Sequence, residues 1–205
     1  MSFWNSTNVF GVLNVSRAFL PHMRERRSGT VVMIGSMVGW VGLVNCGLYC
    51  ASKFAIRGMH TFAKFFGLVF MTIYVGIAET LHQEISPLGL RCFYIEPGAF
   101  RTDLLSESNR APFISRNPDY SEIVKKADDA LMAGAGKQPG DPKKFVKVAV
   151  DLIKGEGVAE GKTLPTGLPL GSDVYGAIKM VCEGTLGMLE EWRDVICSTD
   201  FPKGT

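Results

Sequence analysis

Apolar residues recur along this chain at two different spacings. A continuous apolar run rich in β-branched residues at 30–34 predicts a buried strand of a parallel sheet, and the mostly apolar segment 90–96 is interpreted as a second buried strand. Apolar residues three or four positions apart predict helices instead. These helices are expected at 5–27, from about 45 to 57 with a continuation from Glu79, at 120–132, at 142–154 and at about 172–189.

The ends of two predicted helices carry residues that suit those positions. Asp141 precedes Pro142, a typical N-cap followed by a proline in the first turn. Cations close the first helix and Gly29 follows it, so the basic stretch 22–29 is interpreted as a solvated helix end.

The segment between Arg57 and Glu79 interrupts an otherwise regular helix. Residues 65–78 are uncharged and mostly apolar, too few for a membrane span and too rich in β-branched and aromatic residues for a helix interior. Removing 59–76 joins the flanking sequences into one amphipathic helix. Two hypotheses account for this. The first is that the segment is a translated intron, because codons at its two ends can form splice-like sequences and rejoin in frame. The second is that it is a lineage-specific loop or interface insertion.

Length and composition restrict the class of protein. The chain has 205 residues, enough for one domain with a core, and is 46% hydrophobic and 20% charged. A net charge of +2 gives no support for a nucleic-acid or membrane partner. Five cysteines without a CxxC pair and three scattered histidines indicate reduced thiols and no metal site. No signal-peptide pattern is visible at the N-terminus, so a cytoplasmic protein is expected.

Residues 35–53, GSMVGWVGLVNCGLYCASK, contain the main candidates for chemistry. Tyr49 and Lys53 are four apart, so they share one face of a helix. A lysine ammonium there favours the tyrosinate and lowers the phenol pKa from about 10, which allows proton exchange with an alcohol or carbonyl near neutral pH. Ser36 follows the strand 30–34, where its hydroxyl can reach a substrate oxygen. The apolar loop that contains Trp40 is either a pocket wall or a packed loop.

Ser36, Tyr49 and Lys53, with the sequence YCASK, resemble the catalytic core of the short-chain dehydrogenase/reductase family. The resemblance begins at Asn8 and is readable again at about 77–103. It implies a Ser–Tyr–Lys triad, with Asn8 at the fourth catalytic position of the family. Asn8 could equally be a capping or packing residue.

The segment PGAFRTD resembles the family's PGxxxT motif. By that resemblance Pro97 and Gly98 pass under the nicotinamide ring, and Thr102 bonds its carboxamide or the phosphates. Tyr49 and Lys53 are also expected to contact the cofactor, with the lysine on the nicotinamide ribose.

The resemblance implies an α/β fold, a partial Rossmann-type doubly wound parallel sheet of about three strands at 30–34, 90–96 and 163–170. It implies an NAD(P)-dependent oxidoreductase that interconverts an alcohol and a carbonyl of a small molecule, and a homo-oligomer for the full-length family member.

The family's glycine-rich cofactor motif, TGxxxGxG, does not occur in these 205 residues, nor does the residue that selects NAD or NADP. We therefore expect a single incomplete Rossmann-type domain over 1–205, the catalytic half without the N-terminal cofactor-binding half, and an apolar edge on the strand 30–34. One alternative is a truncated or mis-predicted fragment without activity. Another is a nucleotide-sugar epimerase or dehydratase with Tyr–Lys chemistry, against which the PGxxxT segment and the short C-terminal region argue.

Overall fold

A parallel three-stranded sheet lies at the centre of the part of the chain that the structure describes. This computed structural model describes residues 5–57, 76–109, 115 and 117–201. The strands are β1 (Thr30–Ile34), β2 (Arg91–Pro97) and β3 (Gly167–Leu170), in the spatial order β1-β2-β3. The first predicted strand is confirmed at its predicted residues, the second is displaced by one residue, and the third is shorter than predicted. The fold class, α/β with a partial doubly wound sheet, is confirmed.

Helices connect the strands and account for most of the remaining described residues. The first helical segment starts as a π-helix at Asn5–Gly11 and continues as α1. The helices are α1 (Val12–Arg26), α2 (Gly47–Arg57), α3 (Ile77–Ile85), α4 (Ser121–Ala133), α5 (Pro142–Lys154), α6 (Ser172–Glu191) and α7 (Arg193–Cys197). The predicted cap of α5 is confirmed, since Asp141 accepts hydrogen bonds from the backbone N–H groups of Lys143 and Lys144 at 2.8 and 3.4 Å.

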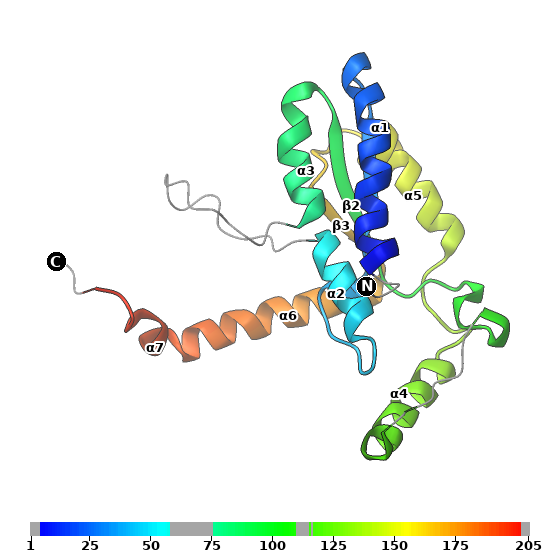
Figure 1. Ribbon diagram of the computed structural model, residues 1–205, viewed down its shortest axis with the longest axis vertical. Helices are drawn as coiled ribbons and strands as arrows, with labels where there is room; N and C mark the ends of the chain where they lie inside the picture. The colour runs from blue at the N-terminus through cyan, green and yellow to red at the C-terminus, as the bar shows by residue number, and fades with distance from the viewer. Residues whose placement is uncertain (1–4, 58–75, 110–114, 116, 202–205) are drawn as a thin grey trace.

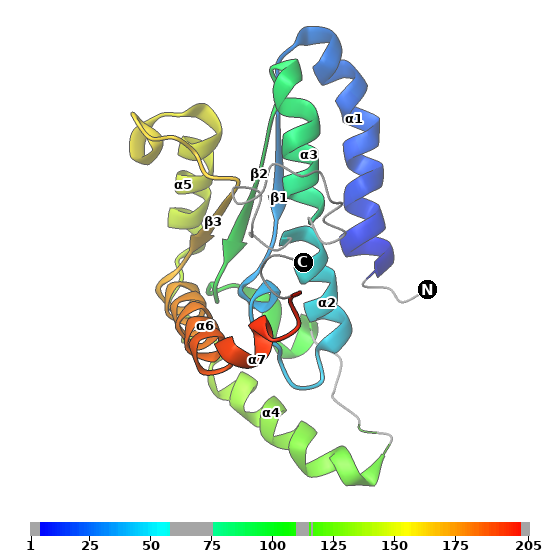
Figure 2. The same ribbon diagram turned by 90° about the vertical axis from the view of Figure 1, so that its left-hand side faces the viewer.

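The two faces of the sheet are covered by different helices (Figure 2). α1, α2 and α3 cover one face, where alternate residues of β2, Cys92 and Tyr94, pack with Met33, Ile56 and Ala78 in one cluster. α5 covers the other face, where the intervening residues of β2 pack against Leu152. β2 is therefore buried on both sides from Cys92 to Glu96, as expected of the central strand of a parallel sheet.

β1 is less buried than predicted. Its first three residues are partly exposed and Ile34 is 47% exposed. The reason is its position, because among the described residues β1 pairs only with β2 and its other side has no strand. An apolar edge on this strand is the feature expected of a sheet that lacks its next strand.

α2 and α3 lie end to end against the same face of the sheet, as both views show (Figures 1 and 2). Ile56 near the end of α2 and Ala78 near the start of α3 belong to the same buried cluster. The interruption at 59–76 falls outside the described residues except for Gly76, which caps α3. Whether it is a translated intron or a genuine insertion stays a prediction.

α4, α6 and α7 lie beyond the carboxyl ends of the strands (Figure 2). α6 leads away from the sheet (Figure 1) and exposes many large apolar side chains, among them Tyr175, Met180 and Leu186. No helix in the described part of the chain combines the length and the apolar character needed to cross a membrane.

Candidate functional site

The candidate site lies where β1 and β2 end. Ser36 comes two residues after β1, in an extended conformation with φ −173° and ψ 158°. Its hydroxyl accepts a hydrogen bond from the backbone N–H of Val38 at 3.3 Å and so starts the short 3-10 helix Met37–Gly39. This contact fixes the hydroxyl at the carboxyl edge of the sheet, where open α/β sheets place their ligands.

The structure brings Tyr49 and Ser36 together. Tyr49 lies in the first turn of α2, and burial raises the pKa of its phenol above 10.0, while a side-chain hydrogen bond with Ser36 lowers that pKa. Burial is the larger of the two effects. The predicted direction is therefore wrong for this structure, where the phenol pKa is raised. Helical spacing indicates that two residues share a face, but how deeply a phenol is buried depends on the tertiary structure.

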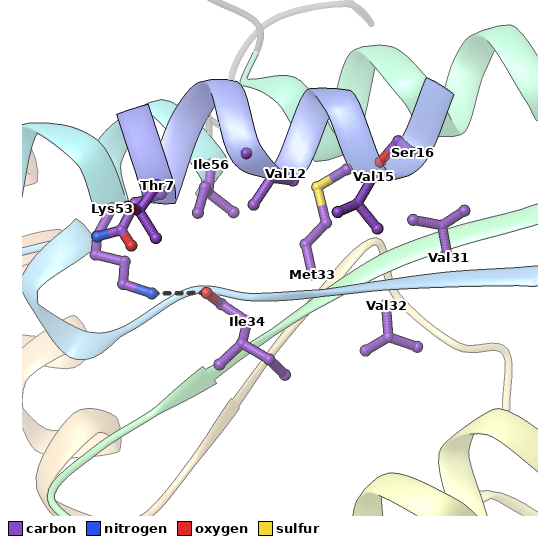
Figure 3. A pocket seen from close by; sticks show the side chains of 12 residues that line it. Thr7, Val12, Val15, Ser16, Val31, Val32, Met33, Ile34, Lys53 and Ile56 are labelled. Atoms are coloured by element: carbon purple, nitrogen blue, oxygen red, sulfur yellow. Dashed lines mark hydrogen bonds between the residues drawn. The ribbon is translucent and has the colours of Figure 1, made fainter. Parts of the chain in front are cut away.

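Lys53 lies one turn after Tyr49 and points toward the end of β1 (Figure 3). Its Nζ donates a hydrogen bond to the Ile34 carbonyl oxygen at 2.9 Å and lies 5.9 Å from the centroid of the Tyr49 ring. Partial burial lowers the lysine pKa from 10.5. The ammonium is thus held beside the tyrosine ring by the last carbonyl of the strand.

Asn8 reaches α2 through a residue that sequence reasoning missed. Its Nδ2 donates to the Ser52 hydroxyl at 3.0 Å, and that hydroxyl donates to the Tyr49 carbonyl oxygen at 2.7 Å. Asn8 is placed there by the π-helical turn at Asn5–Gly11, a local distortion that occurs frequently at functional sites. Ser52 is 1% exposed, and the signal available in the sequence was a hydroxyl three residues after Tyr49.

The Pro97–Gly98 segment is attached to the last strand and to α6. The backbone N–H of Gly98 donates to the Leu170 carbonyl at 3.0 Å, and the N–H of Ala99 donates to Oδ2 of Asp173 at 2.6 Å. Asp173, in the first turn of α6, was not among the predicted site residues. It holds the turn that follows Pro97 in place.

Thr102 lies further along the same segment and is exposed. Its side chain accepts a hydrogen bond from the backbone N–H of Leu104 at 3.4 Å and caps the short 3-10 helix Asp103–Leu105. The structure thus gives Thr102 a local capping role in addition to the cofactor contact that the resemblance implies.

Trp40 packs against charged side chains of α2 and β2. Its Nε1 donates to Oε2 of Glu96 at 2.9 Å, and the Arg57 guanidinium carbon lies 3.2 Å from the centroid of its ring. These contacts support the packing interpretation for Trp40, and the role of the loop as a pocket wall stays a prediction.

An apolar groove of about 500 Å³ runs between α1 and the open side of β1. Asn8 and Lys53 line it together with apolar side chains such as Val12, Val31 and Met33 (Figure 3). The groove therefore joins the candidate site to the strand edge that lacks a neighbour among the described residues.

Comparison with known proteins assigns the family. A family model described as short chain dehydrogenase matches residues 4–65. The 3-ketodihydrosphingosine reductase of Bacteroides thetaiotaomicron is 31% identical over 122 residues, which are 60% of this chain and 39% of that protein. Oxidoreductase BOA17 of Botryotinia fuckeliana is 26% identical over 188 residues, which are 92% of this chain and 59% of that protein.

A solved structure gives the same result. The crystal structure of a short-chain dehydrogenase from Streptomyces avermitilis aligns with a TM-score of 0.71 and 31% identity, covering 95% of this chain and 61% of that one. The chain belongs to the short-chain dehydrogenase/reductase family of oxidoreductases. It spans 39% and 59% of the lengths of the two curated relatives named above.

Proposed function

We propose that this chain supplies the catalytic portion of an NAD(P)-dependent oxidoreductase that interconverts an alcohol and a carbonyl. The observation that carries the proposal is the Ser36–Tyr49 hydrogen bond, formed beside the ammonium of Lys53 at the carboxyl end of β1. This arrangement places the Tyr49 phenol beside both a hydroxyl and a cation. It suits a reaction in which a carbonyl oxygen gains a proton.

In the carbonyl-reducing direction, Tyr49 is the proton donor. Its raised pKa keeps the phenol protonated at neutral pH, the form that a donor requires. Ser36 donates a hydrogen bond to the same substrate oxygen and stabilises the charge that develops on it. A bound nicotinamide supplies the hydride.

Lys53 has two roles in this proposal. Its charge stabilises the tyrosinate left after proton transfer, and its remaining donors are suited to the hydroxyl groups of a nicotinamide ribose. Asn8 supports the arrangement through Ser52, because that chain of hydrogen bonds ends on the backbone of Tyr49.

The residues present fit only one end of the cofactor. Lys53 is partly exposed at the edge where α/β sheets bind ligands. Pro97 ends β2 at that same edge, and Gly98 and Thr102 follow it. The glycine-rich TGxxxGxG pattern that would bind the pyrophosphate does not occur in the sequence. We therefore propose that residues 1–205 form one incomplete Rossmann-type domain whose sheet continues beyond β1, and we leave the choice of NAD or NADP open.

The substrate in this proposal is a small-molecule alcohol or carbonyl. The family resemblance further predicts a homo-oligomer for a full-length protein, and the reduced thiols expected from the cysteine pattern favour a location in the cytoplasm. No contact described above carries either of these two features.

The test joins to this chain the part of the Streptomyces avermitilis enzyme that the chain does not cover. The joined protein is assayed with NADH and NADPH against a panel of aldehydes and ketones. We expect one cofactor molecule to be oxidised for each carbonyl reduced. Conversion of a substrate with no net change in the cofactor would favour the epimerase or dehydratase alternative, and no reaction with any carbonyl would favour a fragment without activity.

A further inference from the structure

A buried cluster of polar residues lies directly behind the candidate site. Arg57 and Glu96 are 6% and 1% exposed, and the nearest atoms of their charged groups, Nε and Oε1, are 3.7 Å apart. That separation is longer than a hydrogen bond, and neither of these two atoms has a hydrogen-bond partner in the described part of the chain. The pair is therefore held by its surroundings and not by a direct bond.

Trp40 completes the cluster. The Arg57 guanidinium lies over the indole ring, a cation–π contact with the guanidinium carbon 3.2 Å from the ring centroid. The same indole donates its N–H to Glu96 at 2.9 Å. One aromatic side chain thus contacts both partners of the ion pair.

Each member of the cluster belongs to a segment that carries a candidate site residue. Trp40 follows the 3-10 helix that Ser36 caps, and Glu96 directly precedes Pro97. Arg57 is on α2, where it follows Tyr49 and Lys53 at the same spacing of four residues. The cluster therefore connects the Ser36 loop, the catalytic face of α2 and the end of β2.

Arg57 also binds the Ser36 loop directly. Its Nη1 donates to the Gly39 carbonyl oxygen at 2.9 Å, a buried hydrogen bond. Gly39 fits closely against α2, because a Cβ at this position would lie 3.2 Å from the Lys53 carbonyl oxygen. The loop thus packs closely against α2 at the backbone of Lys53.

Other charged and titratable groups face this cluster from the surrounding elements. Glu79 of α3 and Tyr94 of β2 interact with both Arg57 and Glu96, and Cys182 of α6 lies near enough to influence Arg57. Burial raises the pKa of Glu96, while the indole hydrogen bond and Arg57 lower it. A buried ion pair is often no more stabilising than apolar residues of the same volume, so its presence calls for a reason other than stability.

We propose that Arg57 is a positioning residue that, through Gly39 and Trp40, holds the Ser36 loop on α2 so that the Ser36 hydroxyl stays on the Tyr49 phenol. The proposal rests on the proposed function, in which that hydroxyl and that phenol act on one substrate oxygen. In this proposal Arg57 itself contacts neither the substrate nor the cofactor. Lysine cannot replace it, because an ammonium lacks the planar fork that stacks on the indole while donating to Gly39.

The test is a double-mutant cycle that needs no turnover. Arg57→Lys, Ser36→Ala and the double variant are prepared in the full chain with 13C-labelled tyrosine rings, and Tyr49 is assigned by its absence from the spectrum of Tyr49→Phe. The titration and the neutral-pH ring-carbon shift of Tyr49 both report whether the Ser36 hydroxyl is bound to the phenol. Arg91→Lys is the matched control, since Arg91 lies at the opposite end of β2, bound to the Ile153 carbonyl.

Because the Ser36 hydrogen bond lowers the Tyr49 pKa, Ser36→Ala should raise it. We expect Arg57→Lys to raise the Tyr49 pKa by at least half as much as Ser36→Ala does. The double variant should raise this pKa no more than Ser36→Ala alone, and Arg91→Lys should not change it. If Arg57→Lys does not fold, Trp40→Phe is measured instead. The phenylalanine keeps an aromatic ring against Arg57 but lacks the N–H that donates to Glu96.

Two results would overturn the proposal. In the first, Arg57→Lys (or Trp40→Phe, if it is used instead) lowers the thermal stability but leaves the Tyr49 signal unchanged. In the second, the effect of that variant on the Tyr49 signal adds to the effect of Ser36→Ala. Arg57 would then be a structural residue only. None of these results depends on catalysis, so failure of the proposed reaction would be seen separately, as absent turnover in a chain whose Tyr49 titration still responds to Ser36→Ala.

Discussion

Gly98→Ala is the change whose effect can be worked out most fully from the structure. A Cβ at this position would lie 2.0 Å from Oδ1 and 2.5 Å from Cγ of Asp173, closer than real contacts allow. The Gly98 backbone is outside the left-handed region, so alanine suffers no strain of its own. The carboxylate of Asp173 must therefore move, and the hydrogen bond that it accepts from the Ala99 N–H at 2.6 Å is lost.

The magnitude follows from that bond. A hydrogen bond to a charged group contributes about 1.5–3 kcal/mol. Replacing glycine by alanine returns about 0.4–1 kcal/mol, because alanine has fewer conformations in the unfolded chain. We expect a net loss of about 1–2 kcal/mol, which for a domain of this size corresponds to a fall in the melting temperature of roughly 2–8 °C.

The assay is denaturant unfolding of four proteins, the natural chain, Gly98→Ala, Asp173→Ala and the double variant. Removing the carboxylate makes room for the methyl group, so adding Gly98→Ala to Asp173→Ala should cost nothing or stabilise by a few tenths of a kcal/mol. Gly176→Ala is the matched control. Its Cβ would meet open space in α6, and we expect it to stabilise the chain by about 0.5–1 kcal/mol.

A Gly98→Ala variant as stable as the natural chain would contradict the predicted clash. An equal loss of stability in the Asp173→Ala background would contradict it too, since the carboxylate would then not be the cause. Either result would mean that Asp173 does not hold the turn after Pro97.

Three further outcomes are expected. Because burial raises the Tyr49 pKa above 10.0, carbonyl reduction by the joined protein should be constant in rate across neutral pH and fall only in the alkaline range as the phenol ionises; a fall centred near neutrality would contradict the raised pKa. Transcript sequencing should detect a spliced form without 59–76, whose product is the more soluble protein; if every transcript encodes the segment and its deletion unfolds the chain, the intron hypothesis is wrong. Calorimetric titration of the 205-residue chain should show NAD(H) and NADP(H) binding no tighter than about millimolar, because the sequence lacks the glycine-rich motif that would bind the adenosine and pyrophosphate. A monomeric chain with micromolar affinity would refute the incomplete domain.

Local sequence was sufficient for the elements whose determinants are local. The run 30–34 became β1 at the predicted residues because five continuous apolar, mostly β-branched residues suit a strand. Asp141 and Pro142 began α5 at the predicted position because a cap acts within its own turn. The spacing of Tyr49 and Lys53 put both on one helix beside Ser36.

Features that depend on distant contacts were not predictable. The indole of Trp40 binds a carboxylate 56 positions away, and no periodicity in the sequence indicates such a pair. The raised pKa of Tyr49 results from burial, which depends on how the Ser36 loop packs over α2. The π-helical turn that places Asn8 likewise has no sequence pattern of its own, and Ser52 became visible as its partner only from the fold.

The proposed function depends on proton transfer by Tyr49 in an alcohol–carbonyl interconversion. Its most direct test is the rate of carbonyl reduction by the joined protein with Tyr49 and with Tyr49→Phe, measured beside the affinity for the reduced cofactor. The phenylalanine variant keeps the ring and removes only the hydroxyl. We expect it to lose turnover almost completely while its cofactor affinity stays nearly unchanged, and retention of more than a few per cent of the rate would exclude Tyr49 as the proton donor.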